Sequence, residues 1–148
     1  MAQYKNILFA TDFSEGASQA VDQARTLASL TGARLHLFHV ITELADKRRR
    51  RIPADVIDVF IREVSQHAEE DMQNFRSTHF SQTDFEVTSR VLVGQGHEDI
   101  LKEAESIQAD LIIQGTHGRA GLEKLLVGSM AEKVLRHARV PVLTVRES

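Results

Sequence analysis

The stretch DLIIQGTHGRAGLEKLLVGS, residues 110–129, contains an apolar run, a glycine-containing loop and the start of a helical pattern. Its first part, residues 110–114, is short, apolar and followed directly by a glycine, which is typical of a buried strand. Its last part, Gly128-Ser129, opens a segment in which apolar residues recur every three or four positions, as they do on a helix. The stretch therefore predicts a strand, a loop and a helix in that order.

The same alternation runs along the whole chain. Strand-like runs rich in β-branched residues are found at 4–11, 33–41, 84–93, 110–114 and 140–145. Helical patterns lie between them, with apolar positions at Ala17, Val21, Ala24 and Ala28; at Ile57, Ile61, Val64, Ala68, Met72 and Phe75; at Ile100, Leu101, Ala104 and Ile107; and at Met130, Val134, Leu135 and Ala138. Parallel strands need long crossover connections, so this alternation predicts an α/β fold, an open parallel sheet with helices on both faces. We expect one domain over residues 1–148.

Residues at the ends of these patterns agree with the assignment. Ser14 is suited to cap the first helix, and Gly32 to end it in the left-handed conformation. Pro53 suits the first turn of the second helix. Residues 42–52 form the one long loop.

Composition narrows the possible functions. The chain has 148 residues and no cysteine, which excludes disulfides, thiolate metal sites and cysteine nucleophiles. Its formal net charge of -3 argues against binding nucleic acid, which requires a broad positive face. No run approaches the roughly 20 apolar residues of a membrane span, and the first apolar run is too short for a signal peptide. We expect a cytoplasmic protein.

Residues suited to an anion follow the predicted strands, where an open parallel sheet binds its ligands. Gly115 and Gly118 permit positive φ and close backbone approach, so the loop can turn amides toward a phosphate. Gly128 and Ser129 add amides at a helix N-terminus and a hydroxyl. The alternative is a flexible turn followed by an ordinary helix cap. Neither a Walker-type loop nor a GxGxxG fingerprint follows the first strand, and we interpret 94–96 as a turn between strand and helix.

The spacing of these residues matches a known signature. The pattern G-x2-G-x9-G-[ST], present here as Gly115, Gly118, Gly128 and Ser129, resembles the ATP-binding signature of the universal stress protein family. The resemblance covers essentially the whole chain. It includes TDFS at 11–14, VLVG from 91, ADLIIQGTHGR at 109–119 and GSMAEKVLRHARVPVLTV at 128–145.

The resemblance implies a Rossmann-like sheet in the order 3-2-1-4-5, a homodimer, and ATP bound between the ends of strands 1 and 4. The intact signature places the chain in the ATP-binding subgroup. Asp12 would contact the ribose or adenine, Ala10, Thr11 and Val40 would line the base pocket, and Gln114 would lie beside the nucleoside. The triphosphate would be held by Gly115, Thr116, His117, Gly118, Gly128, Ser129 and Met130. Ala10 stands where some relatives carry proline.

Three classes of function compete. A nucleotide-dependent stress or signalling module needs only binding, whereas a slow ATPase or nucleotidyl transferase also needs a positioned base near the γ-phosphate. Only His117 and Asp12 are candidates for that base, so we favour binding with at most slow hydrolysis. A phospho-receiver would need an aspartate after the third strand, which ends instead in Val93-Gly94.

Metal binding by side chains alone is not expected. His36 and His39 are three apart on a strand, so they point to opposite faces and cannot share a metal. Mg²⁺ could arrive with ATP. The basic run Lys47–Arg51 is interpreted as a solvated loop segment; the alternatives are a docking site for an acidic partner, a membrane surface or nucleic acid, or a flap over bound phosphates.

The last predicted strand, Val140–Val145, is apolar on both faces and lies at a sheet edge. An exposed edge of this kind favours aggregation unless it is covered. The resemblance implies that a second copy covers it, so we expect a homodimer through this strand.

Overall fold

The computed structural model describes residues 3–14, 18–42, 52–116 and 127–146. Within these ranges strands and helices alternate as predicted. The elements are β1 (Asn6–Ala10), α1 (Ser18–Thr31), β2 (Arg34–Ile41), α2 (Ala54–His79), β3 (Val87–Val93), α3 (His97–Ser106), β4 (Leu111–Gly115), α4 (Ser129–His137) and β5 (Val142–Val145).

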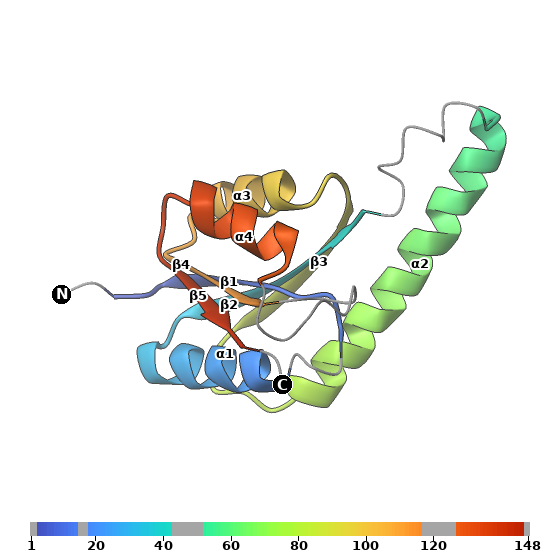
Figure 1. Ribbon diagram of the computed structural model, residues 1–148. Coiled ribbons are helices and arrows are strands. Elements are labelled where there is room, and N and C mark those ends of the chain that lie inside the picture. Colours follow the sequence, from blue (N-terminus) through green and yellow to red (C-terminus); the bar gives the residue numbers. More distant parts are fainter. Residues whose placement is uncertain (1–2, 15–17, 43–51, 117–126, 147–148) are drawn as a thin grey trace.

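The strands form one parallel, five-stranded sheet in the order β3-β2-β1-β4-β5 (Figure 1). β1 is central, with Leu8 opposite His36 of β2 and Ile112 of β4. The strand order reverses between β1 and β4, where an open α/β sheet has its ligand crevice. The fold class and the strand order implied by the resemblance are both confirmed.

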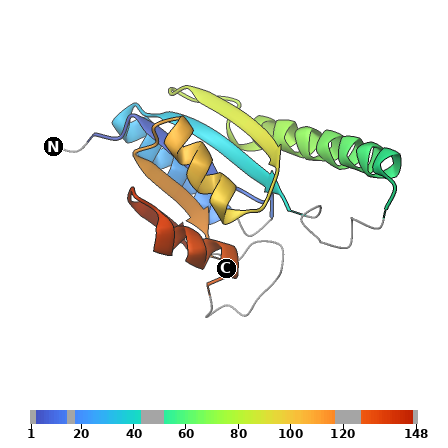
Figure 2. The ribbon, with the colours of Figure 1, turned by 90° about the horizontal axis from the view of Figure 1, so that it is seen from above.

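The helices cover both faces of the sheet, with α1 and α2 on one side and α3 and α4 on the other (Figures 1 and 2). Successive residues of β1 supply both cores. Ile7 and Phe9 pack with α1 and α2, whereas Leu8 packs with α3 and α4. This burial on both faces explains why the strands appear in the sequence as continuous apolar runs.

Two helix ends follow the sequence signals. Gly32 has φ 70° and its amide donates to the carbonyl of Ala28 at 2.9 Å, which ends α1 as predicted. Pro53 precedes α2, and its carbonyl accepts from the amide of Ile57 at 3.1 Å.

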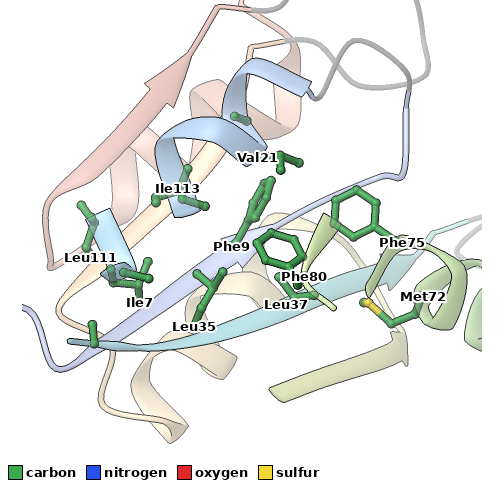
Figure 3. Close-up of a cluster of buried hydrophobic side chains, with 14 residues drawn as sticks. Ile7, Phe9, Val21, Leu35, Leu37, Met72, Phe75, Phe80, Leu111 and Ile113 are labelled. Atoms are coloured by element: carbon green, nitrogen blue, oxygen red, sulfur yellow. The ribbon is translucent and has the colours of Figure 1, made fainter. Parts of the chain in front are cut away.

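The helix α2 is longer than the sheet it covers. Met72 and Phe75, in its second half, lie in the core (Figure 3). In its first half, Val59 and Phe60 are 52% and 48% exposed. Figure 1 shows this half extending away from the sheet. The positions predicted to be in the core in this half are only half-buried: Ile57, Ile61 and Val64.

The predicted core face of α4 is partly wrong. Met130 and Leu135 are 39% and 44% exposed, whereas Val134 is fully buried. Ala131 is buried in place of Met130. The contacting stripe therefore runs through Ala131, Val134 and the half-buried Ala138. A helix of nine residues packs along one narrow stripe, so its other apolar side chains remain exposed.

Among the described residues, no helix is both long enough and apolar enough to cross a membrane.

Candidate functional site

The carboxyl ends of β1 and β4 meet where the strand order reverses. Phe9 of β1 is in register with Ile113 of β4. The strands end at Ala10 and Gly115, so the residues that follow them, 11–14 and Thr116, leave the sheet at the same edge. Ala10 and Val40 both pack against the core under α3 and α4. The structure thus brings Ala10, Thr11, Asp12, Val40 and Gln114 to neighbouring strand ends, as predicted.

The loop after β1 is held by backbone and side-chain hydrogen bonds. The Thr11 amide donates to the carbonyl of Phe38 at 3.0 Å, which extends the β1–β2 pairing by one residue. The Thr11 hydroxyl accepts from the amide of Phe13 at 3.1 Å, and Oδ1 of Asp12 accepts from the amide of Ser14 at 2.9 Å. Such turns hold a short polar loop in one shape. Asp12 thus stabilises its own turn, whatever ligand it contacts.

The buried hydroxyl of Ser14 adds an unusual feature to this loop. Its Oγ makes no hydrogen bond within the described part of the chain. A buried hydroxyl normally has a hydrogen-bond partner, so this exception requires an explanation.

The end of β4 is joined directly to the start of α4. The Gly128 amide donates to the carbonyl of Thr116 at 2.6 Å. The buried Gln114 side chain donates to the carbonyl of Ala131 and to Oγ1 of Thr144, both at 3.0 Å. Residues at the two ends of the glycine-containing stretch are therefore adjacent in space. The Gln114 amide holds α4 against β5, a role that the sequence did not indicate.

Gly128 is the N-cap residue of α4, with φ -60° and ψ 155° and no side-chain cap. Because Gly128 takes this position, Ser129 is the first helical residue, and its side chain is exposed. The first helical amides have no partner within the helix. Because the Gly128 amide donates to Thr116, the amides of Ser129, Met130 and Ala131 are the ones at this helix end that have no partner within the helix.

Gly115 differs from expectation. It is the last residue of β4 and pairs with Val145. Positive φ occurs among the described glycines at Gly32 and Gly96, so Gly115 does not use the positive φ that a glycine permits. Strand pairing with β5 keeps it extended. His117 and Gly118 lie outside the described residues, as does Lys47–Arg51.

The turn between β3 and α3, residues 94–96, contacts α4, and the sequence did not predict this contact. The Gly94 amide donates to the carbonyl of Ile41 at 3.0 Å, and Gly96 has φ 109°. A Cβ at Gly96 would lie 3.2 Å from Cε of Met130 and 3.7 Å from Cγ2 of Thr42. The turn at 94–96 therefore connects β3 to α3 and also packs against the first turn of α4.

His36 belongs to a separate buried network. Its Nδ1 lies 2.7 Å from Oγ1 of Thr88, and its Nε2 lies 2.7 Å from Oε2 of Glu103. Nη1 of Arg90 donates to Oε1 of Glu103 at 2.6 Å. Glu103 is 5% exposed, and a buried carboxylate needs such partners. The described residues form no group of three or more His, Asp or Glu side chains that could hold a metal.

Comparison with known proteins places this arrangement in a family. The model of the universal stress protein family matches residues 3–146. Universal stress protein MJ0577 of Methanocaldococcus jannaschii is 31% identical, over 97% of this chain and 95% of that protein. The structure solved for MJ0577 superposes with a TM-score of 0.86 at 32% identity, covering 99% of both chains.

Two more distant solved structures share the fold and contain nucleotides. A universal stress protein in complex with cAMP has a TM-score of 0.63 at 23% identity and covers 99% of this chain and 100% of that one. The universal stress protein of Archaeoglobus fulgidus in complex with dAMP has a TM-score of 0.58 at 21% identity and covers 97% and 98%. The match over nearly all its length shows that the chain belongs to the universal stress protein family.

Proposed function

We propose that this protein binds ATP at the carboxyl ends of β1 and β4 and acts as a nucleotide-dependent stress or signalling module. The observation that carries the proposal is the 2.6 Å hydrogen bond from the Gly128 amide to the Thr116 carbonyl. It places the first turn of α4 beside the end of β4, next to the Asp12 loop. A helix N-terminus with unused amides attracts phosphate.

The nucleotide would lie with its base toward Ala10, Thr11 and Val40 and its sugar toward Asp12. Its phosphates would be held by the backbone and hydroxyl donors of Gly115, Thr116, His117, Gly118, Ser129 and Met130. Gly128, whose amide donates to Thr116, would only let the backbone approach the phosphates closely. The residues present fit this group, because an exposed hydroxyl and helical amides lie beside the end of β4, and a carboxylate suited to a ribose follows the neighbouring strand β1. Mg²⁺ would enter with the triphosphate and neutralise part of its charge.

The protein would act in signalling as a homodimer. β5 is an edge strand whose residues are all half-buried in this chain, so it keeps apolar surface for a second copy. We take residues 1–148 to be one domain that works in the cytoplasm and passes its state to a downstream protein. Slow ATP hydrolysis or nucleotidyl transfer stays the alternative.

The test is calorimetric titration with ATP, AMP and adenosine, together with mass spectrometry of any nucleotide that the purified protein retains. Ser129→Ala should weaken ATP binding about tenfold, because it removes a hydrogen bond to a charged phosphate. The same change should leave the affinity for adenosine unchanged. Ser106→Ala, an exposed serine at the end of α3, is the matched control. A wild-type protein that binds no ATP at millimolar concentration would rule out the proposal, and ADP appearing over time would favour the enzymatic alternative.

A further inference from the structure

His39, near the end of β2, makes a contact that the proposed function does not use. Its Nδ1 lies 2.7 Å from the carbonyl oxygen of Thr11. A carbonyl only accepts, so Nδ1 must carry the hydrogen and donate it. The bond reaches from β2 to the first residue of the loop after β1. Thr11 is thereby held through both its carbonyl and its amide, since the amide donates to the carbonyl of Phe38.

The His39 ring also supports a strained residue. Phe13 has φ 65°, a left-handed conformation that is unfavourable for a bulky side chain. Its ring lies against that of His39, with centroids 4.5 Å apart, and meets Phe75 of α2 edge-on at 5.7 Å. The packing of Phe13 between β2 and α2 explains how this backbone conformation persists. Strain of this kind tends to occur at functional sites.

These contacts are made by Thr11 and Phe13, the two residues that flank Asp12 in the sequence. Thr11 is held by His39 on one side of Asp12, and Phe13 is held by His39 and Phe75 on the other. His39, on the neighbouring strand β2, therefore contacts both residues that flank Asp12. His39 lies on the face of β2 opposite to Val40, because neighbouring strand residues alternate.

We propose that His39 is a positioning residue of the nucleotide site. It holds the turn 11–14 in the one conformation that presents Asp12 to the sugar of the ligand. The identity of the ligand rests on the proposed function above, whereas the positioning of the turn does not. His39 acts through Thr11 and Phe13 and makes no contact with the nucleotide.

The first experiment measures affinity. His39→Leu removes the donor, and we expect about tenfold weaker ATP binding, the effect of one lost hydrogen bond. His39→Asn keeps an N–H near the place of Nδ1 and should bind within about threefold of wild type. His36→Leu is the matched control, a histidine of the same strand in a different network. It should lower the unfolding midpoint and leave affinity unchanged.

A double-mutant cycle separates positioning from a general loss of stability. In an Asp12→Ala background, His39→Leu should have little further effect, because the group that it positions is already gone. Full additivity of the two changes would contradict the proposal, as would His39→Asn binding as poorly as His39→Leu.

The second experiment needs no ligand. NMR of the free protein should show His39 as the Nδ1–H tautomer and the amides of 12–14 as rigid as the sheet. His39→Leu should make these amides mobile, and His39→Asn should not. An Nε2–H tautomer, or a turn equally rigid in His39→Leu, would overturn the proposal. If the wild-type protein bound no nucleotide, the proposed function would fail and this experiment would still decide the role of His39.

Discussion

At the scale of single residues, the interior of this protein contains buried polar side chains as well as apolar ones. Glu103 lies on the buried face of α3 between His36 and Arg90. The sequence shows it only as a charged residue within an amphipathic helix. Its partners come from strands more than a dozen residues away, so no local pattern reveals the network.

His79, the last residue of α2, gives a prediction on pH. Burial lowers the pKa of His79 below its usual 6.5, the nearby Arg25 lowers it further, and Asp22 opposes both. The guanidinium of Arg25 also donates to the His79 carbonyl. The folded protein therefore binds a proton at His79 less readily than the unfolded chain does.

The free energy of unfolding should be fully maintained above pH 6.5 and should decrease as the pH falls from 6.5 toward the lower folded-state pKa of His79. Urea denaturation between pH 7.5 and pH 5.5 measures this decrease. His79→Gln, which cannot take up the proton, should lose less stability over the same interval. A wild-type protein that lost no more than His79→Gln would contradict the assignment.

Two glycines with positive φ allow a matched test at the site. Gly32 has φ 70°, and an added Cβ would meet nothing within 4 Å. Gly96 has φ 109°, and its Cβ would press on Met130 at 3.2 Å. Gly32→Ala should cost roughly 1 kcal/mol of unfolding free energy and leave nucleotide affinity unchanged.

Gly96→Ala should cost more than Gly32→Ala and should also weaken ATP binding, because the displaced Met130 belongs to the first turn of α4. Denaturation and calorimetry on both variants provide the comparison. Equal affinities for the two would show that the turn at 94–96 does not support the site.

At the scale of elements, α2 combines two environments in one helix. Phe75 is 7% exposed and packs against Phe9, Phe13 and Phe80. Phe60 is 48% exposed in the half that extends beyond the sheet. Both positions are apolar in the sequence, and only the packing distinguishes them.

Phe75→Ala should therefore lower the unfolding free energy by roughly 3–5 kcal/mol, the cost of truncating a buried phenylalanine. Phe60→Ala should change it by less than about 1 kcal/mol, as expected for a position with little packing to lose. Chemical denaturation with both variants measures this difference. A large loss for Phe60→Ala would mean that the first half of α2 is covered in solution.

At the scale of the whole molecule, the sheet has two edges, β3 and β5. β5 is short, and its residues stay half-buried because only β4 pairs with it. Light scattering should show a homodimer. Val142→Lys should convert it to a monomer, because an edge lysine opposes strand pairing. Gln82→Lys, an exposed change near the other edge, should leave the dimer intact. A monomeric wild type would exclude the β5 interface.

Much of the fold follows from the sequence alone. The alternation of apolar runs and helical periods predicted every strand and helix, because each pattern reflects which side of its own element is buried. The four-residue spacing along α2 and the glycine at the end of α1 are local features of this kind. The strand ends and the glycine signature from Gly115 to Gly128 likewise predict a phosphate site, because loop conformation and helix ends depend on neighbouring residues, and that site stays a prediction.

Only the tertiary structure decided which of the apolar and charged positions in those patterns are buried. The exposed half of α2, the exposed Met130 and Leu135, and the buried Glu103 all depend on how much of each helix meets the sheet. The link from His39 to Thr11 joins β2 to the loop after β1, and no local pattern specifies that these two segments are neighbours. The sequence thus determined the elements and the chemistry of the loop, because both are local. Packing across the sheet determined how the loop is held, because those contacts exist only after the strands have paired.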